Sequence, residues 1–103
     1  MRYRDKQSCQ SWYERELNEA AQRLESLRAC IHRLRLDLRP DWERRLDELR
    51  GRHNRGVAKL EALRRANGET WTLAAERAEE AFAALREALA RVDEALTVRP
   101  LAA

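Results

Sequence analysis

Residues 13–42, YERELNEAAQRLESLRACIHRLRLDLRPDW, decide the fold because they contain a complete heptad seam and its first interruption. Seam residues recur there at alternating steps of four and three, from Tyr13 through Leu17 to Leu38. That spacing places them along one stripe of an α-helix. Pro40 interrupts the pattern, since proline has no amide hydrogen and fits the first turn of a helix. The stretch therefore predicts one helix that ends near residue 38 and a second that begins near residue 40.

The same seam begins again at Trp42 and a third time at Trp71, and each start lies 29 residues after the previous one. Twenty-nine is one more than four heptads, so the stripe loses its register before each restart. Asn67 and Gly68 precede the third start and offer the left-handed backbone that ends many helices. We therefore expect three helices joined by short turns, at about residues 5–38, 40–66 and 69–97.

These helices predict an all-α fold, an antiparallel three-helix coiled-coil-like bundle that forms one domain over residues 1–97. Folding them up, down and up places Gly56 opposite Leu24 and Phe82, so that a residue without a side chain meets a large aromatic ring. Residues 98–103 are expected to be a frayed C-terminal tail. The alternative is a long kinked helical hairpin, although Pro40 inside a helix costs about 3 kcal/mol or more.

The composition bounds the function. With 103 residues, of which 44% are hydrophobic and 38% charged, the chain has room for one core and not for a multi-domain enzyme. It contains no Gly-x-Ser-x-Gly frame, P-loop or GxGxxG motif. The closest pair of soft metal ligands, Cys30 and His32, would point to different sides of a helix. We therefore expect no catalytic residues, no cofactor, no metal site and no small-molecule substrate.

The expected location is the cytoplasm. No apolar run approaches the roughly 20 residues that cross a bilayer, and no apolar segment of a secretory signal follows Met1. Cys9 and Cys30 would lie about 31 Å apart on one helix, too far for an internal disulfide. They are expected to be free thiols, as is usual in a reducing compartment, with a bridge between two antiparallel copies as the alternative.

Basic residues are concentrated in the middle of the chain. Residues 23–65 hold 13 basic and 7 acidic side chains, whereas residues 66–103 hold 4 basic and 7 acidic ones. Arginines of the second helix could form a stripe that follows phosphates. Acidic residues interrupt that stripe, and the net negative third helix could neutralise it. Trp12 lies off the seam, where it is either a contact for a partner or a packed residue at the open end of the bundle.

Residues 60–71, LEALRRANGETW, followed by residues 81–88, AFAALREA, resemble the C-terminal half of small uncharacterised bacterial coiled-coil domain-containing proteins. The shared element is Gly-x-x-Trp, from Gly68 to Trp71, followed by an amphipathic helix of alanines and an aromatic residue. This chain differs in using Arg where the family often has Lys, and Phe82 where it often has a second Trp. The resemblance implies a helical fold and a non-enzymatic role, and it supplies no catalytic residues.

The sequence thus predicts a non-catalytic helical coiled-coil protein that acts as a protein–protein interaction or self-assembly module. Its expected partners are protein helices, including its own copies in a homo-oligomer. The alternative is a nucleic-acid-associated basic protein that uses the arginine stripe of the second helix. The candidate contact residues are Trp12, Arg44, Arg45, Arg52 and Arg55.

Overall fold

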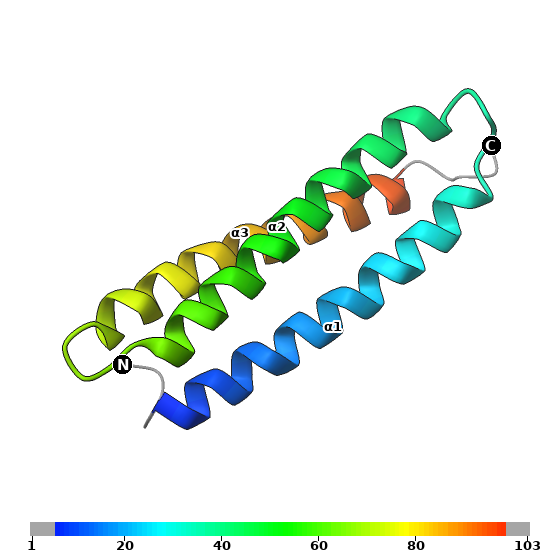
Figure 1. Ribbon diagram of the computed structural model, residues 1–103. Helices are drawn as coiled ribbons and strands as arrows, with labels where there is room; N and C mark the ends of the chain where they lie inside the picture. Colours follow the sequence, from blue (N-terminus) through cyan, green and yellow to red (C-terminus); the bar gives the residue numbers. More distant parts are fainter. Residues whose placement is uncertain (1–5, 99–103) are drawn as a thin grey trace.

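The computed structural model describes residues 6–98, and the side chains of residues 6–96, as three antiparallel helices (Figure 1). They are α1 (Lys6–His32), α2 (Arg39–Arg65) and α3 (Trp71–Val98). The α1/α2 turn and the α2/α3 turn lie at opposite ends of the molecule (Figure 1). The predicted all-α three-helix bundle is confirmed. The kinked hairpin is wrong, because two turns separate three helices of nearly equal length.

The first helix ends six residues earlier than the seam predicts, at His32 instead of residue 38. The guanidinium of Arg39 donates hydrogen bonds to the carbonyl oxygens of His32 (3.0 Å) and Leu34 (3.1 Å). These bonds satisfy carbonyl groups that a helix end leaves without a partner. Leu34 still reaches the core from the turn, with 3% of its surface exposed, whereas Leu38 is 42% exposed. Pro40 lies in the first turn of α2, as expected.

The second turn forms without the left-handed residue that was expected at Gly68. No described residue has a positive φ. Instead Ala66 takes an extended conformation, and the Asn67 amide donates to the Thr70 hydroxyl (3.1 Å). The Asn67 side-chain oxygen in turn accepts from the amide of Glu69 (3.3 Å). These side chains therefore order the turn, and the third helix begins at Trp71 instead of residue 69.

The core consists of two clusters that follow one another along the bundle axis. Near the α2/α3 turn, the Tyr13 and Phe82 rings meet edge to face with their centroids 4.3 Å apart. The buried members there are Cys9, Tyr13, Leu17, Leu60, Leu63, Ala78, Ala81 and Phe82. Near the α1/α2 turn they are Leu24, Leu27, Ile31, Leu34, Leu46 and Leu49. The predicted seam therefore lies inside a single chain.

The pairing of α1 with α2 differs from the prediction by one heptad. A Cβ atom built on Gly56 would lie 3.2 Å from both Leu17 Cδ2 and Phe82 Cε1. The predicted neighbour Phe82 is thus confirmed, but the other neighbour is Leu17 instead of Leu24. The reason is the early end of α1, because a turn centred between residues 33 and 38 moves the antiparallel partners along α1 toward the N-terminus.

The predicted tail, residues 98–103, begins with Val98, which is the last residue of α3. Residues 99–103, like residues 1–5 of the predicted domain, lie outside the described part of the chain. Among the described helices, none is long and apolar enough to cross a bilayer.

Candidate functional site: the outer groove between α2 and α3

Ion pairs and hydrogen bonds connect α1 to both of its neighbours. Arg64 of α2 pairs with Glu14 at 2.8 Å, and Arg86 of α3 pairs with Glu16 at 2.8 Å. A third pair joins Arg23 of α1 to Asp93 of α3. These three are the ion pairs that join different helices among the described residues, and each has one partner in α1. The charged flanks of α2 and α3 that face α1 are therefore matched across the boundary.

The α1/α3 boundary is also partly desolvated. The Tyr13 hydroxyl donates a hydrogen bond of 2.7 Å to Glu79, and Arg86 pairs with that same carboxylate at 2.8 Å. Burial raises the pKa of the Glu16 carboxyl, although the hydrogen bond and positive charge of Arg86 act in the opposite direction. This boundary also has a hollow of about 170 Å³, lined by Glu16, Glu19, Ala20, Arg23, Phe82, Leu85, Arg86 and Leu89. Both arginines that line it, however, pair with carboxylates across the boundary, from helix to helix.

Trp12 belongs to that packed boundary. Its side chain is half-buried and packs against the core cluster near the α2/α3 turn. The ring lies 5.1 Å from Tyr13, measured between centroids, and the Arg86 guanidinium lies 5.7 Å from its centroid. The structure therefore places Trp12 as a packed residue near one end of the bundle, which was one of the two interpretations of its position off the seam.

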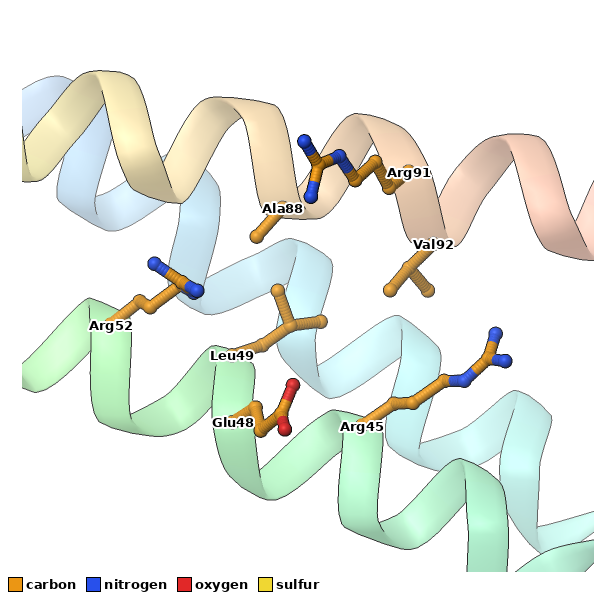
Figure 2. A pocket seen from close by; sticks show the side chains of 7 residues that line it. All are labelled: Arg45, Glu48, Leu49, Arg52, Ala88, Arg91 and Val92. Atoms are coloured by element: carbon orange, nitrogen blue, oxygen red, sulfur yellow. The ribbon is translucent and has the colours of Figure 1, made fainter.

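The outer boundary between α2 and α3 is hollowed at two places, which together we call the α2/α3 groove. The first hollow has a volume of about 200 Å³ and is shown in Figure 2; it is lined by Arg45, Glu48, Leu49 and Arg52 of α2 and by Ala88, Arg91 and Val92 of α3. The second measures about 410 Å³ and is lined by Lys59, Ala62, Arg65, Ala66, Thr70, Leu73, Ala74 and Arg77. Both lie on one flank of α2, because Arg45, Arg52 and Lys59 are seven residues apart.

Small residues on α3 explain the shape of the groove. Ala74, Ala81 and Ala88 recur at seven-residue intervals on the flank that faces α2, and Gly56 lies on the seam of α2. The backbones of α2 and α3 approach each other more closely than those of α1 and α3. Alanine methyl groups fill little of the space between the long flanking side chains. The result is an alanine-rich floor with cationic walls.

The predicted arginine stripe is only partly on this groove. Arg45 and Arg52 line it, and Arg55 occupies the same flank of α2, one heptad after Glu48. Arg44 is exposed and lies 3.4 Å from Asp41 of its own helix. Arg45 is also placed over the ring of Trp42, with 4.5 Å between the guanidinium carbon and the ring centroid. The structure thus brings together two of the four arginines that the sequence singled out and separates Arg44 from them.

On α2, Lys59 and Arg65 also line the groove. Sequence reasoning missed the cations that α3 contributes, which are Arg77 and Arg91. The usable signal was the 14-residue interval between Arg77 and Arg91, which places both on one flank of a heptad helix. They were overlooked because the third helix was treated as a net negative neighbour.

No ion pair between described residues joins an acidic residue of α3 to a basic residue of α2, although the sequence left such neutralisation open. The α3 carboxylates that form ion pairs in the described part of the chain pair with α1 or with α3 itself. Asp93 pairs with Arg23 of α1, Glu79 with Arg86, and Glu87 with Arg91. Of the cations that line the α2/α3 groove, Arg91 therefore pairs within its own helix, and no ion pair between described residues joins a groove cation to another helix.

No family model, curated protein or solved structure matches this chain. The resemblance to small bacterial coiled-coil proteins therefore stays a prediction. Within residues 6–98, no group of three His, Cys, Asp or Glu side chains is arranged to hold a metal ion. We take the α2/α3 groove as the candidate site because cations of both helices line it, whereas the arginines beside the α1/α3 hollow are paired with carboxylates across that boundary.

Proposed function

We propose that this protein is a non-catalytic interaction module that binds a protein helix on the outer surface of its bundle, in the α2/α3 groove. The observation that supports this most directly is the asymmetry of charge pairing. The boundaries of α1 are matched by ion pairs, whereas cations from both α2 and α3 converge on an alanine-rich floor at the remaining boundary.

The burial of the seam favours a partner on the outside. Leu17, Leu49 and Phe82 are each at most 7% exposed within one chain, so a second chain is not needed to cover them. The two cysteines are free thiols, and Cys9 is buried. A location in the reducing cytoplasm is therefore part of this proposal.

The first test is the molar mass in solution, measured by size-exclusion chromatography with light scattering at two protein concentrations and with reductant. A mass near the 12.1 kDa of one chain at both concentrations is the expected result. A mass of twice or three times that value, if the double variant Arg52→Glu with Lys59→Glu did not lower it, would show that the seam is exchanged between chains. The protein would then be a self-assembly module, and the proposed role of the outer surface would be wrong.

Nucleic-acid binding is the second candidate, and one observation favours it. Neither Arg52 nor Arg55 forms an ion pair with a described residue, and both lie on one flank of α2 with Arg45. Two of the aromatic rings that could stack on bases are already engaged, because Trp42 lies beneath Arg45 and Phe82 is buried. A filter-binding assay over a salt series tests this function. Loss of binding even at about 50 mM salt would exclude it.

A further inference from the structure

We propose that the occupant of the α2/α3 groove is an acidic amphipathic helix of another protein, which lies along the groove as a fourth helix of the bundle. Its carboxylates pair with the groove cations, and its apolar side chains enter the two hollows. This inference rests on the proposed function and specifies the chemistry of the partner.

The cations form two clusters, one around each hollow. Arg45, Arg52 and Arg91 line the first hollow together with the acidic residue Glu48, and Arg91 also pairs with Glu87 of its own helix. Figure 2 shows that Arg52 and Arg91 extend from facing helices on either side of Ala88, while Arg45 reaches past Val92. Guanidinium groups suit carboxylates because each can donate two parallel hydrogen bonds. A glutamate or aspartate placed above Ala88 would therefore contact arginines of both helices.

The second cluster contains Lys59, Arg65 and Arg77 and has no acidic lining residue. Its floor is formed by Ala62, Ala66 and Ala74. This hollow is therefore cationic at its walls and apolar at its base, like the first.

The spacing of the cations matches a helix. Arg45, Arg52 and Lys59 repeat every seven residues, which corresponds to about 10.5 Å along a helix axis. A partner helix with acidic residues at heptad positions presents carboxylates at the same interval when it packs nearly parallel to α2. The distance from Arg45 to Arg65 corresponds to about 30 Å, so about 21 residues of partner helix cover both clusters.

The apolar floor distinguishes a helix from nucleic acid. The first hollow partly exposes Ala88 and Val92 between its arginines, above the buried Leu49, and the second is bordered by Leu73, which is 51% exposed. Phosphate groups gain nothing from apolar contact, whereas the leucines of an amphipathic helix lose contact with water there. The combination of cationic walls and an apolar floor therefore favours a protein helix.

A second copy of the chain is the less suitable occupant. The outer face of α3 does carry exposed acidic residues, Glu76, Glu80, Glu87 and Glu94, at helical spacing. The residues between them on that face are small, since Ala83 and Ala90 occupy the corresponding positions. Such a face could match the charges but would leave both hollows unfilled. Dimerisation through the groove would accordingly contradict the proposal.

The test uses the full chain and two labelled synthetic peptides of about 21 residues, the length that spans both clusters. One peptide has three heptads with Leu at positions a and d and Glu at e and g, and the other has Lys at e and g. Like charges at e and g keep each peptide from pairing with itself. Binding is followed by fluorescence anisotropy. We expect the Glu peptide to bind at least about tenfold more tightly than the Lys peptide, with weaker binding as salt is raised.

Two double variants locate the binding site. Arg52→Glu with Lys59→Glu reverses two cations of the groove and should weaken binding of the Glu peptide by about tenfold or more. Arg44→Glu with Arg50→Glu is the control, because it makes the same charge change on the same helix outside the groove. The control should change the affinity by no more than about twofold. Thermal melts followed by circular dichroism establish that both variants are folded.

Several results would overturn the proposal. Equal losses in the two variants would indicate non-specific attraction between net charges. No binding of the Glu peptide, or preferred binding of a DNA duplex of about 20 base pairs at the same salt, would exclude an acidic helix as the occupant. A dimer that Arg52→Glu with Lys59→Glu dissociates would identify a second copy instead. If neither variant changed binding of the Glu peptide, the groove would not be the binding site, but helix binding elsewhere on the outer surface would still stand. A seam-exchanged oligomer would refute both the groove site and helix binding on the outer surface.

Discussion

Two glycines of α2 provide a direct test of the packing between the three helices. Gly51 is exposed, and a Cβ atom added there meets no atom within 4 Å. Gly56 is buried, and a Cβ atom added there lies 3.2 Å from Leu17 Cδ2 and from Phe82 Cε1. Because both glycines lie inside the same helix, Gly51→Ala and Gly56→Ala share the gain in helix propensity and differ in the space available.

The magnitudes follow from these distances. Alanine is favoured over glycine inside a helix by about 0.8–1 kcal/mol, so Gly51→Ala should stabilise the protein by about that amount. At Gly56 the new methyl group lies roughly 0.3–0.8 Å inside the usual carbon–carbon separation of about 3.5–4.0 Å for two neighbours. Relieving such overpacking costs about 1–3 kcal/mol. Gly56→Ala should therefore be less stable than Gly51→Ala by about 1 kcal/mol or more.

The assay is urea unfolding followed by circular dichroism, in which the two variants are compared with the parent chain at equal protein concentration. Gly56→Leu extends the series, and it should be destabilised by about 1–3 kcal/mol or more because its side chain is longer. If Gly56→Ala were as stable as Gly51→Ala, the predicted crowding against Leu17 and Phe82 would be wrong. If Gly56→Leu were also neutral, the assignment of these three residues to one layer would fail.

Other predictions concern the same end of the core. Phe82→Ala should cost about 3–5 kcal/mol in the same unfolding assay, because it removes the ring that meets Tyr13; a cost below about 1 kcal/mol would contradict its central position. In a Cys30→Ser variant, alkylation of Cys9 should be much slower in the folded protein than in urea, since Cys9 is fully buried and burial raises the pKa of its thiol. A thiol pKa that is higher in the folded state makes stability decrease as pH rises above the ordinary value of about 9.0, which urea titrations across that range would measure. Equal alkylation rates in the two states would show that the first turns of α1 open freely.

The heptad pattern predicted the elements of the fold well because helix formation and seam burial are local properties of the sequence. The restarts at Trp42 and Trp71, together with Pro40, gave the number of helices and their approximate bounds. The pattern predicted the end of α1 wrongly, because Leu34 and Leu38 continue the heptad spacing of the sequence although the helix ends at His32. Hydrogen bonds from Arg39 to two carbonyl oxygens, which no periodicity encodes, stabilise a turn in that place.

The candidate site could be predicted only in part, because it depends on which helices face each other. Heptad spacing shows that Arg45 and Arg52 share a flank of α2. A three-helix bundle can, however, be left-handed or right-handed, depending on which side of the α1/α2 pair the third helix lies. That flank would face α1 in one arrangement and α3 in the other. Arg91 could therefore be assigned to the site only once the handedness of the bundle was known.

The ion pairs of α1 explain why a bundle of the observed handedness has a cationic α2/α3 groove. Glu14 meets Arg64 and Glu16 meets Arg86, so the carboxylates of α1 are directed toward the flanks of α2 and α3 that border it. The opposite arrangement would turn Arg64 and Arg86 away from these carboxylates. Individual exposed pairs contribute little to stability, but Glu16 and Arg86 are partly desolvated, which strengthens their preference for one arrangement. The pairing that favours this handedness of the bundle thus also places cations of α2 and α3 together on the α2/α3 groove.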